Sequence, residues 1–276
     1  ALGGSAVFFS AAASLFTDVR IVGVVGEDYN LNDLDFLKQR GVDLEGLLQV
    51  PGETFHWGGV YSEDPNERET LFTNLGVFAD FNPEIPEKYK KSDYVFLANI
   101  DPDLQLKILE QVEKPKLVVL DTMNLWIDIK LDSLKKVISK TDLLIVNDSE
   151  ARMLTGINDL NKALRKLFDL GPSNIVVKKG EHGSVTMQGE DMFFCSIYPV
   201  EMAFDPTGAG DTFAGGFLGY IGEQGKTDWR TIRRAMVYGS AAASFTVEDF
   251  SINKLKAITR QDVERRVEKI RELTSF

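Results

Sequence analysis

The sequence predicts an α/β fold in which helices cover both faces of a mostly parallel central sheet, a three-layer α/β/α sandwich. Short runs of β-branched and other apolar residues alternate with helix-length segments over most of the chain, and this alternation is typical of parallel sheets with right-handed crossovers. The rhythm breaks at residues 47–78, where aromatic, Thr-rich segments interrupted by glycine indicate a small antiparallel sheet. We therefore expect a core formed by residues 1–46 and 79–276, with residues 47–78 inserted as a β-sheet lid.

The first part of the chain should form a glycine turn and an apolar helix over residues 1–16. A β-branched run closed by glycine predicts a buried strand at 19–26. Residues 31–41 have leucines on one face and a terminal glycine, which predicts a helix. Within the lid, two strands should flank the turn-like residues 64–67.

From residue 94 onward, strands and helices are expected to alternate regularly. The predicted strands are 94–99, 116–121, 142–147 and 174–180, followed by a pair at 183–188 and 192–197 around a turn. The predicted helices are 103–112, 131–139, 148–154, 159–168, 209–224, 228–247 and 260–273.

Composition restricts the partners and the compartment. The 276 residues include 31 Lys and Arg against 42 Asp and Glu, which gives a formal net charge of −11. Such a balance disfavours nucleic acid and anionic membranes, so we expect neither as a partner. The single cysteine excludes an intramolecular disulfide, and no apolar run is long enough to span a membrane. We expect a cytoplasmic protein.

Polar residues gather where the predicted strands end. Ligands of parallel α/β sheets bind just beyond the carboxyl ends of the strands, so residues at these five ends are candidates for one site. They are Asn99 with Asp101, Asp121 with Asn124, Asn147 with Glu150, residues 178–183 and residues 205–211. Loops are polar in any protein, which is the alternative for each cluster taken alone.

The segment DPTGAGDTFAGGF at 205–217 carries the clearest chemistry. Gly208, Ala209 and Gly210 remove side-chain bulk at the start of a helix, where N–H groups and the helix dipole favour an anion such as a phosphoryl group. A simple N-cap role for Asp211 is the alternative. The segment is neither GxGxxG nor a P-loop, which argues against a dinucleotide oxidoreductase and a P-loop enzyme.

This segment resembles the second signature of the ribokinase-like (PfkB) carbohydrate kinases, D-T-x-G-A-G-D-x-F, with Pro206 where Thr is common. The resemblance implies that Asp211 is the catalytic base. It implies that the backbone of residues 208–211 holds the transferring phosphoryl group. It also implies that Asp205 and Thr207 bind a monovalent cation such as K⁺.

Two further motifs resemble the nucleotide side of the same family. Asn147 and Glu150 match its N-x-x-E motif, which implies a role in organising Mg²⁺ through water and the phosphates of ATP. A helix N-cap with an acidic first turn is an equally good explanation, and both can hold. Lys178, Gly180 and Gly183 match the family's nucleotide loop, for which a hairpin turn is the alternative.

The substrate side resembles the family less completely. Gly3 and Gly4 match a G-G pair that implies main-chain donors to substrate hydroxyl groups, but Phe8 stands where relatives usually have Asn. Asp121 and Asn124 resemble a D-x-N pair beside the acceptor, with a spacing that is one residue longer. Relatives also begin with a strand that carries an acceptor-binding Asp, which we expect to lie upstream of residue 1.

The resemblance implies an ATP-dependent, Mg²⁺-requiring phosphotransferase that acts on a hydroxyl group of a sugar or sugar derivative. A nucleoside kinase of the adenosine type is the first alternative, since aromatic residues gather near the expected acceptor. These residues are Phe8, Phe9, Phe55 and Trp57. A nucleotide-binding pseudokinase or sensor is the second alternative. Lids of this type often pair with their twin, which implies a homodimer through residues 47–78.

Overall fold

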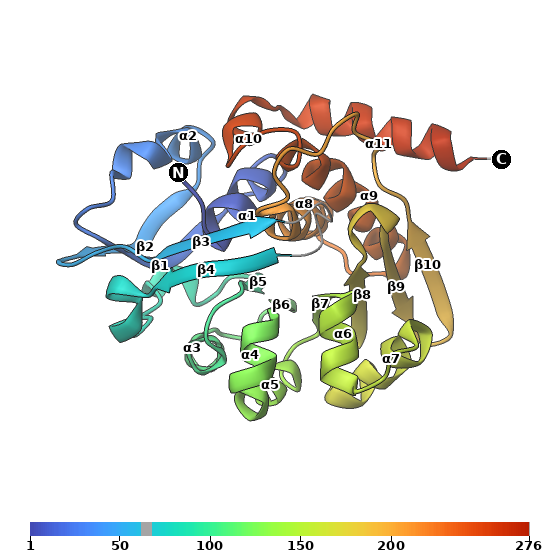
Figure 1. The fold of residues 1–276 in the computed structure, drawn as a ribbon, viewed down its shortest axis with the longest axis horizontal. Helices are drawn as coiled ribbons and strands as arrows, with labels where there is room; N and C mark the ends of the chain where they lie inside the picture. Colours follow the sequence, from blue (N-terminus) through green and yellow to red (C-terminus); the bar gives the residue numbers. More distant parts are fainter. Residues whose placement is uncertain (62–67, 276) are drawn as a thin grey trace.

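The computed structural model describes residues 1–61 and 68–275, and its core is a six-stranded sheet (Figure 1). The strand order is β10-β9-β8-β7-β6-β5. Strands β5 to β8 are parallel, as the alternation predicted, and β9 and β10 complete the sheet in antiparallel fashion. The strands are β5 (Tyr94–Leu97), β6 (Leu117–Asp121), β7 (Leu143–Asn147), β8 (Asn174–Lys178), β9 (Ser184–Gln188) and β10 (Asp191–Cys195). The predicted fold class is confirmed.

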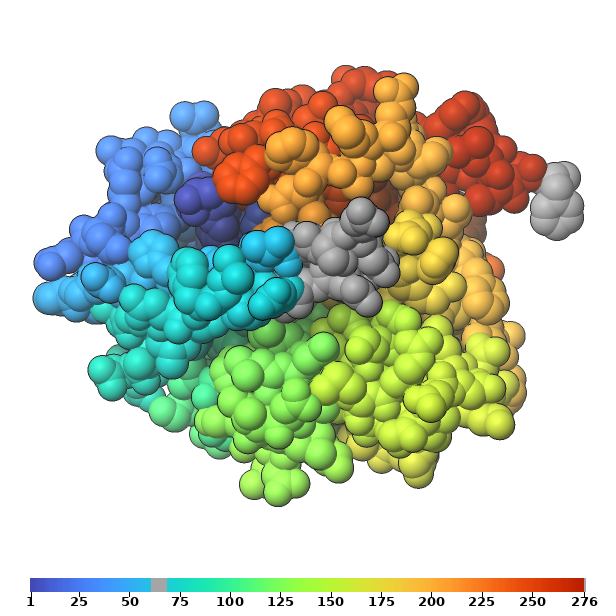
Figure 2. Space-filling view, in the orientation of Figure 1, coloured from blue at the N-terminus to red at the C-terminus, as the bar shows by residue number. Residues whose placement is uncertain are grey.

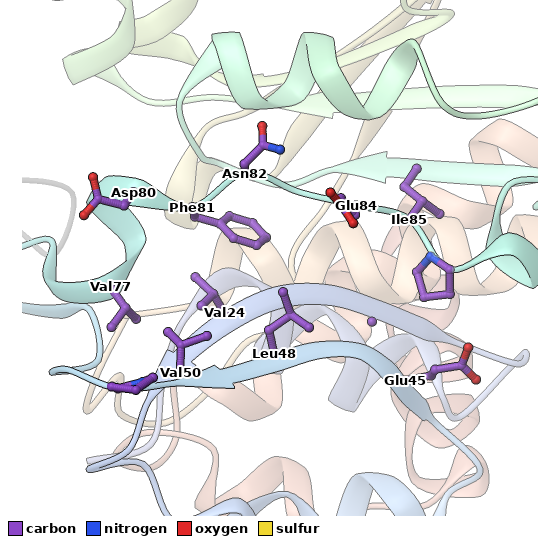
Figure 3. Close-up of a pocket in the computed structure, with 13 residues that line it drawn as sticks. Val24, Glu45, Leu48, Val50, Val77, Asp80, Phe81, Asn82, Glu84 and Ile85 are labelled. Atoms are coloured by element: carbon purple, nitrogen blue, oxygen red, sulfur yellow. The ribbon is translucent and has the colours of Figure 1, made fainter.

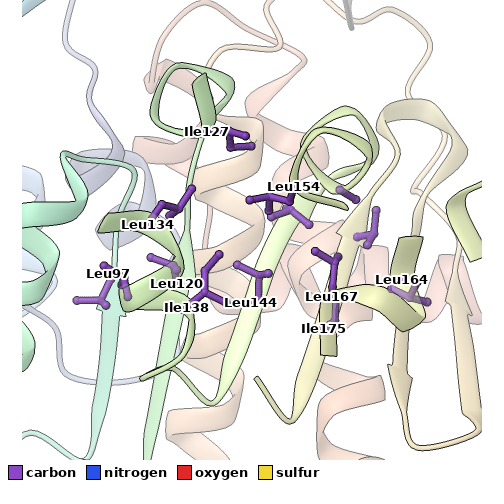
Figure 4. Close-up of a cluster of buried hydrophobic side chains, with 14 of the residues drawn as sticks. Leu97, Leu120, Ile127, Leu134, Ile138, Leu144, Leu154, Leu164, Leu167 and Ile175 are labelled. Atoms are coloured by element: carbon purple, nitrogen blue, oxygen red, sulfur yellow. The ribbon is translucent and has the colours of Figure 1, made fainter. Parts of the chain in front are cut away.

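Helices pack on both faces of this sheet. Successive residues of a strand point to opposite faces, so each face contributes side chains to a different hydrophobic cluster. On β7, Leu144 and Val146 belong to the cluster that Figure 4 shows, together with residues of α4 to α7. Leu143 and Ile145 face the opposite way and join residues of α8 (Ala209–Gln224) and α9 (Trp229–Thr246). The first layer comprises α3 (Pro102–Leu109), α4 (Asn124–Ile129), α5 (Leu131–Ile138), α6 (Asp148–Thr155) and α7 (Leu160–Leu167).

The second layer is built around α8 (Ala209–Gln224) and α9 (Trp229–Thr246). A third apolar cluster joins this layer to the N-terminal part of the chain and to the last helices. Its helices are α1 (Ser5–Ala13), α2 (Asp35–Gln39), α10 (Asn253–Ala257) and α11 (Arg260–Thr274). No helix in residues 1–61 and 68–275 is both long and apolar enough to cross a bilayer.

The strand predicted at 19–26 forms a separate two-stranded sheet. β1 (Arg20–Gly26) pairs in parallel with β2 (Asp43–Val50), and neither is hydrogen-bonded to the six-stranded sheet. The sequence did not predict β2, which crosses the expected boundary between core and lid. Gly46 interrupts its apolar pattern because the chain is crowded there: a Cβ at residue 46 would lie 2.5 Å from the carbonyl oxygen of Ile21.

The antiparallel hairpin predicted in the lid is present as β3 (His56–Tyr61) and β4 (Arg68–Asn74). The turn expected at 64–67 lies outside the described residues. In Figure 2 the hairpin, in cyan, lies between the blue N-terminal part and the green helices.

Hydrogen bonds fix the base of this hairpin to the end of β1. The Gly26 N–H donates to Thr54 Oγ1 at 2.9 Å, while Asp28 Oδ1 accepts from the Thr54 N–H at 2.8 Å and from its hydroxyl at 2.6 Å. The hydrogen bond from the Thr54 hydroxyl is the main reason that the pKa of Asp28 lies below its usual value. These hydrogen bonds hold the start of the hairpin at the end of β1.

Candidate active site

The start of α8 is the centre of the candidate site. Gly208 is its N-cap, with φ of 80°, a left-handed conformation that glycine adopts without strain. Asp211 lies in the first turn of the helix. The first N–H groups of any helix lack intrahelical acceptors and point out of its end. The structure thus brings the glycine turn, the helix dipole and a carboxylate to one point, as the sequence predicted.

Phe8 explains why residue 208 must be glycine. The Phe8 side chain is buried, and its ring atoms lie 2.4 Å from where a Cβ at residue 208 would be. A Cβ at Gly3 would lie 3.9 Å from the same ring, and Gly4, with φ of 92°, opens α1. Gly3 and Gly4 therefore lie close to the glycine turn, and Phe8 packs beneath it.

The direction of α8 is set by close contact with two helices. A Cβ at Gly215 would lie 2.3 Å from the Phe9 carbonyl oxygen, and one at Gly219 would lie 2.9 Å from the Cα of Ala13, both on α1. On the other side, a Cβ at Gly216 would lie 2.8 Å from the Ala242 side chain of α9. The small residues that follow the signature in sequence thus let α8 pack between α1 and α9.

Asn147 and Glu150 form a capping box at the start of α6. The Asn147 side chain accepts from the Glu150 N–H at 2.8 Å. The two oxygens of Glu150 accept from the Asn147 N–H at 2.7 Å and from its side-chain amide at 2.8 Å. The capping alternative is therefore present in the structure. Glu150 is 5% exposed, so its carboxylate is held rigidly in the interior beside the ends of the strands.

Lys178 and Asp121 form an ion pair that the sequence did not predict. Lys178 Nζ lies 3.1 Å from Asp121 Oδ1, and the two side chains are 19% and 7% exposed. Burial alone would lower the pKa of the lysine, but the carboxylates of Asp121, Glu150 and Asp211 outweigh it and raise that pKa. The family resemblance implied that Asp121 lies beside the acceptor. In the structure the Asp121 carboxylate contacts Lys178. Asn124 is exposed at the start of α4.

The turn after Lys178 requires glycine at position 183. Gly183 has φ of 77°, and a Cβ there would lie 2.1 Å from the Cys195 carbonyl oxygen. The Lys179 N–H donates to the Gly183 carbonyl at 2.8 Å, which closes the turn that contains Gly180. The hairpin-turn alternative is thus present, and a nucleotide-binding role for the same loop stays a prediction.

The carboxylate of Asp205 connects the glycine turn to the segment around Ser251. Its Oδ1 accepts from the Thr207 N–H at 2.9 Å, and its Oδ2 accepts from the Ser251 N–H at 3.4 Å. The Ser251 hydroxyl in turn donates to the Leu2 carbonyl. Asp205 therefore orders the glycine turn relative to the N-terminal segment. Among the described residues no group of three or more His, Cys, Asp or Glu side chains is placed to hold a metal ion.

A cleft of about 730 Å³ lies apart from these residues, between β2 and the segment 76–86 (Figure 3). It contains none of the site residues that the sequence predicted. Its lining residues are Val24, Glu45, Gly46, Leu48, Val50, Pro51, Val77, Asp80, Phe81, Asn82, Glu84, Ile85 and Pro86.

Comparison with known proteins agrees with this geometry. Residues 2–256 match the family described as pfkB family carbohydrate kinase. Cytidine kinase of Thermococcus kodakarensis is 32% identical over 223 residues, which cover 78% of this chain and 78% of that protein. Nucleoside kinase of Methanothermobacter thermautotrophicus is 27% identical over 252 residues, or 90% of this chain and 78% of that protein.

Solved structures show the same fold. The nucleoside kinase of Methanocaldococcus jannaschii has a TM-score of 0.78 at 23% identity, over 97% of this chain and 86% of its own. The ribokinase of Arabidopsis thaliana, solved with ribose and ATP, has a TM-score of 0.75 at 25% identity, over 96% of this chain and 87% of its own.

The packing of Phe8 generates a test at position 208. Gly208→Ala should destabilise the fold by more than the roughly 1–2 kcal/mol that a left-handed alanine costs, because its methyl group meets the Phe8 ring. Gly225→Ala is the matched control: Gly225 caps the other end of α8 with φ of 64°, and a Cβ there has nothing within 4 Å.

Thermal or denaturant unfolding of both variants measures the difference. Adding Phe8→Leu to Gly208→Ala should recover part of the loss, because the ring is what the methyl group meets. Equal destabilisation by Gly208→Ala and Gly225→Ala would contradict the packing account.

Proposed function

The chain belongs to the pfkB family of carbohydrate kinases, and we propose that it transfers the γ-phosphoryl group of ATP to a hydroxyl group of a pentose ring, free or within a nucleoside. The observation that carries this proposal is the start of α8. There Gly208 opens a helix N-terminus, and Asp211 sits in its first turn. Phosphoryl transfer depends chiefly on positioning and on stabilising the charge of the transferring group, which is what this arrangement offers.

The names of the relatives support the pentose ring as the acceptor class. They are cytidine kinase, nucleoside kinase, ribokinase, ribose-1-phosphate kinase and deoxyribokinase. Each of these names denotes an acceptor that contains a ribose or deoxyribose ring. A pseudokinase or sensor is not favoured, because mere nucleotide binding would not need the Asp211 carboxylate at the cradle.

In the proposed reaction the acceptor oxygen attacks the γ-phosphorus in line, and an O–P bond forms. The bond from the γ-phosphorus to the β,γ-bridging oxygen breaks, and ADP leaves with its electron pair. Asp211 accepts the acceptor's proton, and the N-terminal end of α8 favours the ionised carboxylate that this requires. The main-chain N–H groups of residues 208–211 hold the transferring group.

We propose that ATP lies over the strand ends that carry Asn147, Lys178 and the Gly180–Gly183 turn. Mg²⁺, when bound, would neutralise phosphate charge and keep most of its own water. Asn147 and Glu150 fit such a site because the capping box holds their side-chain oxygens in place and the Glu150 side chain is buried. Gly3 and Gly4 are proposed to donate main-chain N–H groups to hydroxyl groups of the acceptor, and Asn124 to lie beside it. We also propose a cytoplasmic location, which the single cysteine supports, and no nucleic-acid partner, which the net charge of −11 supports.

Asp211→Asn tests the proposed base. Its kcat should fall by about 10²- to 10⁴-fold, the range for a lost general base, while the affinity for ATP is retained. The assay measures ADP release with cytidine, adenosine, inosine, ribose, deoxyribose and ribose-1-phosphate as acceptors. Asp228→Asn, which alters the N-cap of α9 instead, serves as the control. Near-wild-type turnover of Asp211→Asn, or wild-type protein inactive on every acceptor, would contradict the proposal.

We propose a monovalent cation, such as K⁺, at Asp205 and Thr207. Its effect would be to support the glycine turn that Asp205 already orders through the Thr207 N–H. Turnover should rise when choline chloride is replaced by KCl at constant ionic strength, and Asp205→Asn should lose that response. Identical rates in the two salts would remove the cation from the account.

We propose that residues 47–78 form a lid over the acceptor and a homodimer contact. Three apolar residues of the hairpin are exposed: Val60 at 52%, Leu71 at 60% and Phe72 at 56%. Exposed apolar patches often mark protein–protein interfaces. Light scattering after size exclusion should give twice the mass of 30.8 kDa, and Leu71→Lys should give the monomer. A wild-type monomer at micromolar concentration would contradict the dimer.

A further inference from the structure

We propose that the Lys178 ammonium group contacts the transferring phosphoryl group, and that Asp121 is the positioning residue that holds it there. The inference rests on the proposed kinase function and deepens it. It gives Lys178 a part in the transfer step, beyond a place in a nucleotide loop, and it gives Asp121 a task other than binding the acceptor.

The position of Nζ is the first argument. A Cβ at Gly210 would lie 3.0 Å from Lys178 Nζ, so the ammonium group lies against the second glycine of the turn. A side chain at position 210 would compete with the lysine for this space. The glycine therefore does two things: it bares the backbone, and it admits a full positive charge next to the N–H groups that are proposed to hold the phosphoryl group.

The path of the lysine side chain is the second argument. Lys178 ends β8 and is paired in register with Asn147 at the end of β7. Its side chain passes the end of β7 to reach Asp121 at the end of β6. The side chain thus bridges the ends of β8 and β6 across the end of β7, and its Nζ lies next to Gly210 at the start of α8. A flexible four-carbon stem is held in one geometry by this bond.

The local charge is the third argument. The carboxylates of Asp121, Glu150 and Asp211 all act on Lys178 and keep it protonated despite burial. An ammonium group has three donors, so one can stay with Asp121 Oδ1, 3.1 Å from Nζ, while another meets an incoming phosphoryl oxygen. Preorganised donors of this kind act most strongly where water is excluded.

A purely structural ion pair makes a different prediction. Neutral groups of similar size can often replace a buried ion pair without loss of stability, whereas removal of one partner leaves the other charge uncompensated. The double variant Lys178→Met with Asp121→Asn removes both charges at once. A structural role would leave this variant active, and a role in the transfer step would not.

During the step, Lys178 donates a hydrogen bond to a non-bridging oxygen of the γ-phosphoryl group as the acceptor oxygen attacks. No proton leaves the lysine. The acceptor's proton goes to Asp211, and ADP carries away the electron pair of the broken bond, as in the proposed reaction. The ammonium group thus stabilises charge on the transferring group and takes no other part.

The experiment compares Lys178→Met, Asp121→Asn, the double variant and Lys166→Met. The exposed Lys166 side chain pairs with Asp169 at 2.8 Å and belongs to no part of the proposed site, so its removal is the control. With an acceptor that the wild type phosphorylates, Lys178→Met and the double variant should both lose about 10²- to 10³-fold in kcat, the scale of one lost oxyanion donor, with little change in the KM of the acceptor. Asp121→Asn should lose about tenfold, the scale for a group that orients another, and Lys166→Met nothing.

A binding measurement adds a readout that does not depend on turnover. ADP with Mg²⁺ and aluminium fluoride mimics the transferring phosphoryl group. Calorimetry should show that Lys178→Met and the double variant bind this mixture at least tenfold more weakly than the wild type, yet bind ADP equally well. Unfolding curves identify any variant whose loss comes from misfolding.

The outcomes separate the two proposals. If the wild type turns over and the double variant matches it in kcat and in fluoride-complex affinity, the inference about Lys178 is overturned and the kinase proposal stands. If the wild type phosphorylates none of the acceptors, the kinase proposal fails, and the role of Lys178 fails with it.

Discussion

The site depends on the close packing of α8 against its two neighbouring helices. Gly215 and Gly219 let α1 approach, and Gly216 lets α9 approach, at distances that any larger side chain would prevent. A helix that is fixed on two sides can aim its N-terminus reproducibly, and a preorganised anion site needs this more than it needs any one side chain. Phe8 extends the same constraint to the turn itself, because its ring fills the space under Gly208.

The second requirement of the site is a balance of buried charge. Three carboxylates, those of Asp121, Glu150 and Asp211, lie around one lysine. This excess of negative charge would repel an anion such as a phosphate. Helix dipoles, main-chain N–H groups and bound cations must therefore offset it. The proposed binding of a triphosphate by a chain with a net charge of −11 therefore depends on a local positive potential, most of which the backbone would supply.

Much of the fold could be predicted from the sequence because the strands of a parallel sheet are buried on both faces. Residues 143–146 of the strand predicted at 142–147 are all apolar, and the alternation of such runs with helices indicates a parallel sheet. β2 escaped prediction because Gly46 breaks its pattern for a reason outside the strand, the proximity of Ile21. The glycine turn and the Asn147–Glu150 pair could be predicted because local spacing defines them. The Lys178–Asp121 contact could not, since it joins residues 57 positions apart through a side chain whose conformation only tertiary packing decides. Phe8 stands where relatives usually have Asn. Nothing in the sequence accounts for this difference, whereas the structure shows that the Phe8 ring packs against Gly208.

A crystal structure with Mg²⁺ and a non-hydrolysable ATP analogue would show whether the terminal phosphate binds at the start of α8. The measured quantity is the distance from the oxygens of the terminal phosphate to the main-chain nitrogens at the start of α8. We expect hydrogen bonds of about 3 Å to the main-chain nitrogens of Gly210 and Asp211, with the Asp211 carboxylate facing the same phosphate. A terminal phosphate bound elsewhere, for example in the cleft between Leu48 and Phe81, would contradict it.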